Sequence, residues 1–233
     1  MSIFPLFSSL KVFFLLVFLG GMQLHSFSQN LKEDIKLINE SYLEASSLQQ
    51  EMHVQLFSSH DAKQAIESYT AFIQRKGESF YMRRAQTESL SNARMSLLID
   101  HRSKSILLQK PVEMHMPGLG EMNLDSALSI CEKTVYEQKS AERGVYHFHM
   151  KDYLYESLSI EFDLQTHFLR KFSFYAADPE NDFRMEISFS NIKRNLAFPK
   201  NTFSETKFLS QKSGKYSPTS SFATYQILNY LSK

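Results

Sequence analysis

The sequence predicts an α+β protein in which an antiparallel sheet is covered by two or more helices. Three consecutive segments, 156–164, 168–175 and 184–190, alternate apolar and polar residues, which is typical of antiparallel strands with one apolar and one solvated face. Two other segments, 30–50 and about 123–135, carry apolar residues at steps of three and four, as amphipathic helices do. The chain also has 20 Phe and 11 Tyr but no Trp. Aromatic residues of a strand-rich chain usually fill a core and less often line an apolar cavity.

The first 28 residues are predicted to be a cleavable signal peptide. Lys11 is the only charge before the apolar run 12–19, which ends at two glycines, and small residues at Ser26 and Ser28 favour cleavage before Gln29. An uncleaved anchor is the alternative, but a membrane span needs about 20 apolar residues, more than twice the length of this run. No cysteine follows the run, so no lipid anchor is expected. We expect an exported chain without a transmembrane segment.

The remaining residues, 29–233, are predicted to form a single domain, since about 205 residues suit one large domain and no linker or repeat divides them. Cys131 is the only cysteine, so no intramolecular disulfide can form. This favours the periplasm of a Gram-negative bacterium over a eukaryotic secretory pathway. Lys plus Arg number 26 and Asp plus Glu 25, without the basic excess of a nucleic-acid-binding protein. No nucleic-acid partner is expected.

The apolar stripes define the two expected helices. The first carries Ile35, Ile38, Tyr42, Ala45 and Leu48. The second, capped by Asn123 or Asp125, carries apolar side chains at four positions; they are Leu124, Leu128, Cys131 and Val135. Further strands are expected at 52–57, 66–75, 79–88, 95–99, 105–110, 145–150 and 221–231, with turns at 76–78, 100–104 and 178–182 and a loop at 111–120.

Several residues could carry chemistry, but each also has a structural interpretation. His147 and His149 share one face of a strand and could bind zinc together with Asp152; that face is expected to be solvated, and no metal is expected. Cys131 could be a nucleophile, but its apolar neighbours favour packing in the core. Carboxylates line the polar strand faces, where solvation is the default and a glycosidase pair the alternative; they are Glu156, Glu161, Asp163 and Glu186.

No sequence motif indicates an enzyme. Gly118-Leu119-Gly120 lacks the third glycine and the strand–helix context of a dinucleotide-binding site, and neither a P-loop nor a Gly-x-Ser-x-Gly pattern occurs. We expect no catalytic function and no cofactor. A hydrolase would require His147, His149 or His101 to gather with carboxylates in a pocket.

The order of these elements resembles the periplasmic lipoprotein-carrier superfamily of the LolA and LolB type. Residues 80–110 carry most of the resemblance: a strand ending in 88–90 leads through Asn92 to 95–100 and, after a polar turn, to 104–108. The strands at 157–164 and 168–175 continue the pattern. The resemblance implies a curved sheet forming an incomplete β-barrel, with the helices on its concave, apolar face and a cavity there that takes acyl chains. The chain is longer than a minimal carrier, especially at 195–233.

The apolar faces of the three clearest strands define the candidate cavity. Its predicted residues are Leu158, Ile160, Phe162, Phe172, Phe174, Met185, Ile187 and Phe189. We expect an exported, non-enzymatic protein that binds or carries a lipid, the acyl chain of a lipoprotein or another apolar ligand in a half-barrel. The alternative is a structural or interaction component of a cell-envelope assembly, with a protein partner and no small ligand. An exported hydrolase is the third hypothesis.

Overall fold

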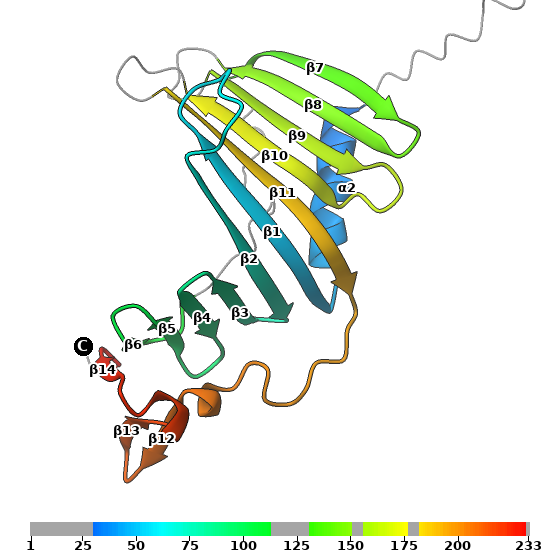
Figure 1. Ribbon diagram of the computed structural model, residues 1–233. Coiled ribbons are helices and arrows are strands. Elements are labelled where there is room, and N and C mark those ends of the chain that lie inside the picture. The colour runs from blue at the N-terminus through cyan, green and yellow to red at the C-terminus, as the bar shows by residue number, and fades with distance from the viewer. Residues whose placement is uncertain (1–29, 113–130, 151–155, 177–181, 232–233) are drawn as a thin grey trace, which may run out of the picture. The chain divides into compact units, whose positions relative to one another are not determined.

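The computed structural model describes residues 30–112, 131–150, 156–176 and 182–231, and the chain from Lys32 onward forms one compact unit. Its main feature is a twelve-stranded sheet in the order β14-β6-β5-β4-β3-β2-β1-β11-β10-β9-β8-β7, with a separate hairpin, β12-β13 (Figure 1). The elements are α2 (Leu31–Leu43), β1 (Ser47–Phe57), β2 (Glu67–Lys76), β3 (Ser79–Arg84), β4 (Thr87–Ser91), β5 (Ser96–Asp100), β6 (Ser105–Gln109), β7 (Cys131–Ser140), β8 (Arg143–Met150), β9 (Ser157–Asp163), β10 (Leu169–Ala176), β11 (Phe183–Arg194), β12 (Leu209–Lys212), β13 (Lys215–Pro218) and β14 (Gln226–Asn229), with 3₁₀ turns at Glu205–Lys207 and Ser220–Phe222.

The strands expected from period-two alternation are present. β9, β10 and β11 pair antiparallel in succession, as predicted. The turn expected at 76–78 joins β2 to β3, and Gly77 there has a φ of +55°, a left-handed conformation that glycine adopts without steric cost. The predicted strand 79–88 is two strands, because the chain reverses at Ala85 with a φ of +43°. The turn expected at 178–182 lies almost wholly outside the described residues.

The α+β class with two or more helices is wrong. The fold is mostly β, and α2 is the one α-helix in the described part of the chain. Cys131 and Val135 lie in β7 instead of a second helix, while Leu124 and Leu128 fall outside the described residues. Four-residue steps between apolar positions fit a strand as well as a helix, because an even step also returns to the same face of a strand. The run Thr134-Val135-Tyr136 favours the strand, and β8 supplies its hydrogen-bonding partner.

The first helix ends earlier than its apolar stripe. Ile35, Ile38 and Tyr42 are buried in α2 as predicted, but Ala45 follows the helix and Leu48 belongs to β1, where both are buried. Arg75 on β2 donates to the carbonyls of Tyr42 at 2.5 Å and of Ala45 at 3.0 Å. The first bond occupies a backbone acceptor that the end of a helix leaves unsatisfied, and the second holds the chain that follows the helix.

In the described part of the chain, buried apolar side chains gather on both faces of the sheet. We call the face that carries Tyr146 and Ile160 the helix-side face, because Tyr146 bonds to Asp34 of α2. The other face is the far face. On β3 to β6 the far face is covered by the chain after β11. This far-face core contains Tyr81, Leu90, Leu97, Ile99, Ile106 and Leu108 of the sheet with Phe208 and Leu209 of the C-terminal segment.

The C-terminal segment ends in a short strand, β14, which lies inside the range 221–231 where a strand was predicted. The expected strand at 221–231 is a 3₁₀ turn followed by β14, which adds to β6 in parallel. Every other neighbouring pair of the twelve-stranded sheet is antiparallel. No helix in the described residues is both long and apolar enough to cross a membrane.

Candidate functional site

The eight residues predicted to line an apolar cavity share the helix-side face. Strand pairing places Leu158 opposite Phe174, which lies opposite Met185. The next cross-strand row contains Ile160, Phe172 and Ile187. Phe162 and Phe189 continue the same strand faces, two residues beyond Ile160 and Ile187.

Neighbouring strands extend both rows with apolar residues that sequence reasoning did not include. The first row runs from Phe148 on β8 through β9, β10 and β11 to Leu56 on β1, and the second runs from Tyr146 to Val54. The alternation of Met52, Val54 and Leu56 marks β1 as a strand. Nothing local places it beside β11, which follows more than 100 residues later. Each row crosses five strands and therefore spans about 19 Å, or four strand spacings.

Helix α2 covers one end of this face. Tyr146 donates to Asp34 at 2.5 Å, and Tyr42 makes an edge-to-face contact with Phe168, with ring centroids 5.1 Å apart. The ring of Tyr146 also stacks on the ring of Phe162, with the ring centroids 5.9 Å apart. Burial and the bond to Asp34 raise the pKa of Tyr146, so its proton stays on the hydroxyl.

Burial divides the eight predicted residues into two groups. Ile160, Phe162 and Phe189 are buried. The other five are only half-buried, although they are large and apolar and lie side by side; they are Leu158, Phe172, Phe174, Met185 and Ile187. We call these five residues the central strip. A contiguous apolar strip that is not fully covered is typical of a ligand or partner surface.

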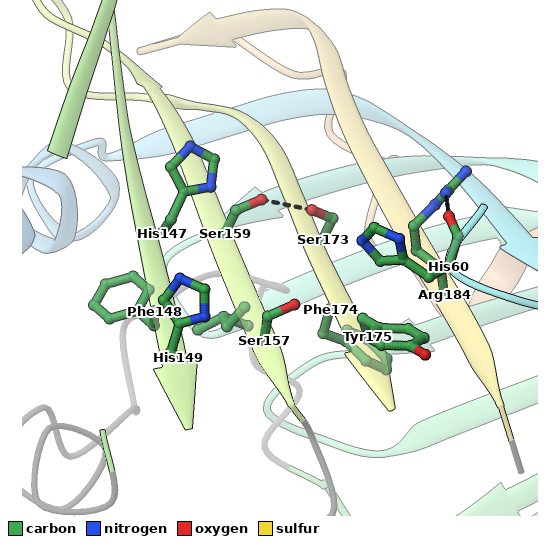
Figure 2. A pocket seen from close by; sticks show the side chains of 11 residues that line it. His60, His147, Phe148, His149, Ser157, Ser159, Ser173, Phe174, Tyr175 and Arg184 are labelled. Atoms are coloured by element: carbon green, nitrogen blue, oxygen red, sulfur yellow. Dashed lines mark hydrogen bonds between the residues drawn. The ribbon is translucent and has the colours of Figure 1, made fainter. Parts of the chain in front are cut away.

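The far face of the same strands carries a pocket that polar and apolar groups line together. Its volume is about 280 Å³, and Figure 2 shows His147 and His149 along β8, with the Ser159 and Ser173 hydroxyls 2.6 Å apart on the next two strands. It is lined by His60, His147, His149, Ser157, Ser159, Ser173, Tyr175 and Arg184; Phe148, Leu158 and Phe174, whose strand positions belong to the helix-side face, also border it. His147 is half-buried and His149 exposed, so they lie on the solvated face, as predicted.

Three basic side chains of this pocket have carboxylate neighbours. His147 Nε2 lies 3.4 Å from Glu137, and Arg184 Nε lies 3.1 Å from Glu186. His60 lies 3.1 Å from Asp61. Arg184 also donates to the carbonyls of His60 and Ala62 and thereby holds the β1–β2 connection against β11. Arg184, the guanidinium of this pocket, is therefore already paired with a carboxylate.

The chemistry considered for these residues needs more than the pocket supplies. A serine hydrolase requires a hydrogen bond between the nucleophile and its base, but the Ser159 hydroxyl pairs with Ser173 in the described structure, and not with His147. Three or more potential metal ligands do not gather anywhere in the described residues. Asp152, the third ligand considered for zinc, lies outside them.

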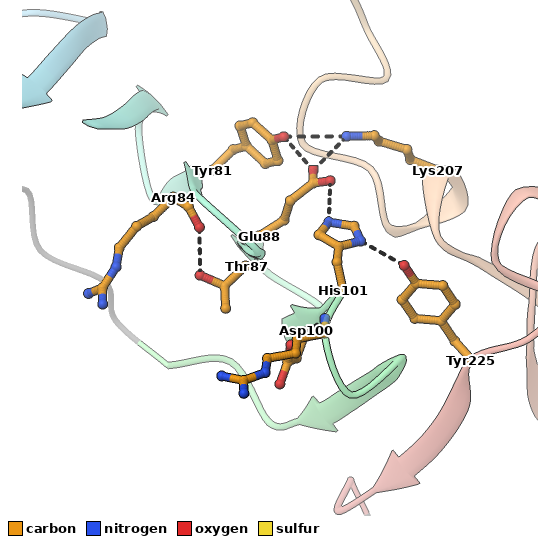
Figure 3. A network of polar contacts seen from close by, with 9 residues as sticks. Tyr81, Arg84, Thr87, Glu88, Asp100, His101, Lys207 and Tyr225 are labelled. Atoms are coloured by element: carbon orange, nitrogen blue, oxygen red, sulfur yellow. Dashed lines mark hydrogen bonds and ion pairs between the residues drawn. The ribbon is translucent and has the colours of Figure 1, made fainter. Parts of the chain in front are cut away.

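His101 lies in a different network that joins the C-terminal segment to the sheet. Its Nε2 is 3.0 Å from Glu88 and its Nδ1 is 2.7 Å from the Tyr225 hydroxyl, while Lys207 and Tyr81 donate to the other Glu88 oxygen (Figure 3). Burial alone raises the pKa of Glu88, but the bonds from Lys207, Tyr81 and His101 outweigh it and hold that pKa below its usual value. Both ring nitrogens and both carboxylate oxygens are occupied, which indicates a structural role.

The remaining candidates are also structural. Glu161 pairs with Lys139 and Arg143, and Asp163 pairs with Arg170. The expectation that Cys131 packs in the core is wrong: it is half-buried on β7, and its thiol lies 3.2 Å from the Lys133 carbonyl. The thiol is not embedded because β7 is the last strand of the sheet.

No protein-family model matches the sequence, and neither does any curated protein. Similar solved structures include an uncharacterized conserved protein from Thermus thermophilus, at 8% identity and a TM-score of 0.48 over 87% of this chain and 100% of that one. A LolA superfamily protein from Nitrosomonas europaea is similar at 10% identity and a TM-score of 0.36, over 76% and 98%. MucB, in its complex with MucA from Pseudomonas aeruginosa, is similar at 10% identity and a TM-score of 0.40, over 80% of this chain and 62% of that one.

The superfamily that the sequence resembles is thus among the similar structures, as a likeness of fold at low identity. Superpositions with TM-scores below 0.5 do not assign a ligand or a partner.

Proposed function

We propose that this chain is an exported, non-enzymatic periplasmic protein that holds the acyl chain of a lipid or lipoprotein against the helix-side face. The observation that carries the proposal is the central strip, five large apolar side chains that remain half-buried beside a filled core. Burying apolar surface contributes about 25 cal/mol per Å², so an apolar ligand that covers the strip gains binding energy without any catalytic group. The N-terminal segment, with its apolar run and small residues before Gln29, supports export.

The shape and chemistry of the strip favour an acyl chain. The strip crosses three strands, β9 to β11, and therefore spans about 10 Å, or two strand spacings; this is enough to hold part of an extended fatty acyl chain. Four of its five members, Phe172, Phe174, Met185 and Ile187, lie on β10 and β11 in the middle of the two cross-strand rows. No charged residue interrupts the rows between Phe148 and Leu56 or between Tyr146 and Val54.

Single-tryptophan reporters test the proposal, because the chain has no Trp of its own. Phe172→Trp places the reporter on the central strip, and Tyr175→Trp places a matched reporter on the far face of the same strand. Titration with a long-chain fatty acid should shift the emission of Phe172→Trp saturably and leave that of Tyr175→Trp unchanged. Native mass spectrometry of protein purified from the periplasm should find a co-purifying lipid.

Two results would contradict the proposal. One is an emission that stays constant, or changes equally, in both variants. The other is purified protein that carries no lipid. A silent Phe172→Trp reporter together with a protein partner recovered by cross-linking in cells would support the alternative, an interaction component of an envelope assembly.

A further inference from the structure

Strand β7 is an open edge of the sheet. It is the last strand in the order, and among the described residues only β8 pairs with it. Apart from the half-buried Cys131 and Tyr136, its residues are exposed. An exposed edge presents a row of unpaired backbone N–H and C=O groups, which can pair with a strand of another chain.

The regular part of this edge is short and defined at both ends. Register shifts fall between Cys131 and Lys133 and between Gln138 and Ser140. Such irregularities interrupt the regular ladder, and they leave six residues in continuous register with β8, 133–138. Val135, in this stretch, exposes 37% of its surface.

The charges of this stretch are complementary to a second copy of itself. Two copies related by a two-fold axis normal to the sheet would pair antiparallel, with each face of one sheet continuing the same face of the other. With the axis at Val135, Lys133 of each copy lies opposite Glu137 of the other, and Thr134 lies opposite Tyr136. Opposite charges in directly opposed positions stabilise a strand pair.

Neighbouring registers lack this complementarity. An axis at Thr134 places Lys133 opposite Val135. It also places Glu137 opposite Cys131 of the partner strand, which lies outside the regular stretch. An axis at Tyr136 places Val135 opposite Glu137 and runs into the irregularity at Lys139. Among the described residues, His147 is the ion-pair neighbour of Glu137, at 3.4 Å, and the Glu137 side chain is 56% exposed, so it can face a lysine of a second copy.

We propose that β7 pairs antiparallel with β7 of a second copy, centred on Val135, and joins two twelve-stranded sheets into one. This dimer is independent of the apolar ligand, because β7 contributes none of the residues of the central strip.

Charge exchange in the full chain tests the register. Sedimentation velocity over a range of concentrations should show a monomer–dimer equilibrium. Lys133→Glu and Glu137→Lys should each weaken the dimer at least about tenfold, since each places like charges opposite one another twice. The double variant Lys133→Glu/Glu137→Lys should restore the dimer. Circular dichroism and thermal unfolding establish that all three variants fold.

A cysteine at the axis supplies an independent readout. Opposed residues of antiparallel strands have Cα atoms about 4.5 or 5.5 Å apart, within the range that a disulfide bridges. Val135→Cys, made with Cys131→Ser, should form a disulfide-linked dimer far faster than Leu43→Cys in the same background, a control at an exposed helix position. The native Cys131 should not cross-link to itself, because it lies opposite Lys139 in this register.

A chain that stays monomeric at every concentration would overturn the proposal, whether the edge is then open or occupied by another protein. Dimers that respond equally to Lys133→Glu and to the double variant would also overturn it. So would Val135→Cys cross-linking no faster than Leu43→Cys.

Discussion

Asp163 closes the β9–β10 hairpin by accepting several hydrogen bonds at once. Its Oδ1 accepts from the backbone amides of Gln165 at 3.1 Å and Thr166 at 2.9 Å, and its Oδ2 lies 2.6 Å from Arg170. Burial alone raises its pKa, but Arg170 and Thr166 outweigh it and lower that pKa to about 2. A carboxylate bound in this way stabilises the folded state only while it is ionised.

Asp163→Asn should therefore destabilise the protein in a pH-dependent way. A lowered folded-state pKa contributes stability that is full above the unfolded value, near pH 4, and is lost as pH falls towards 2. The variant should be less stable by about 2 kcal/mol at pH 7, and the difference should shrink towards zero at pH 2. Urea unfolding between pH 2.5 and pH 7 measures it. Asp61→Asn, at an exposed position, is the control, and a difference that is constant with pH would contradict the assignment.

The bond between Asp34 and Tyr146 joins α2 to β8. Both residues are buried, so Tyr146→Phe leaves a buried carboxylate without its partner and should cost about 1–3 kcal/mol of unfolding free energy. Tyr136→Phe is the matched control, because the Tyr136 hydroxyl makes no hydrogen bond within the described part of the chain. A double-mutant cycle with Asp34→Asn should give a coupling energy clearly above zero. Equal losses in the two Tyr→Phe variants would show that the bond contributes nothing.

At the scale of elements, α2 depends on contacts that are distant in sequence. Most of the stability of a 13-residue helix comes from packing and not from its own hydrogen bonds. Ile35 and Ile38 supply the packing, and Arg75 holds the C-terminal end.

Arg75→Gln should loosen α2 selectively. The substitution removes a charged donor from the two carbonyls at the helix end, and such bonds each contribute about 1.5–3 kcal/mol. Hydrogen–deuterium exchange in residues 31–43 should accelerate more than exchange in β9 and β10. Arg83→Gln on β3, where the side chain is exposed, should leave α2 unchanged. Uniform acceleration across the sheet would mean that Arg75 stabilises the whole fold instead.

At the scale of the whole molecule, the sheet is stabilised from both faces by different parts of the chain. Phe208, which is fully buried, packs from the C-terminal segment onto the far-face core of β3 to β6. Lys207 and Tyr225 add the polar network around Glu88 and His101.

Phe208→Ala should therefore destabilise the entire protein, although it lies after the last long strand. Removing a buried phenylalanine costs about 3–5 kcal/mol. Leu228→Ala, in the same segment but 38% exposed, should cost far less. Urea unfolding followed by circular dichroism measures both. If Phe208→Ala and Leu228→Ala both lowered the free energy of unfolding by a similar small amount, the C-terminal segment would pack only loosely on the sheet.

The local elements could be predicted from the order of residues alone. Alternation in β9, β10 and β11 identified three strands and the residues that share a face, since side chains in a strand alternate with a period of two. The buried stripe of Ile35, Ile38 and Tyr42 identified α2. The eight predicted residues do lie on one face, but whether they hold a ligand stays a prediction.

Which elements meet could be learned only from the folded chain. β1 lies beside β11 through pairing across most of the chain, and the tail after β11 covers the face opposite α2. The same structure makes Cys131 and Val135 part of a strand, since their four-residue step suits helix and strand equally. The physical reason is that periodicity is local, whereas strand partners and the choice of covering segment depend on burial across long separations in sequence.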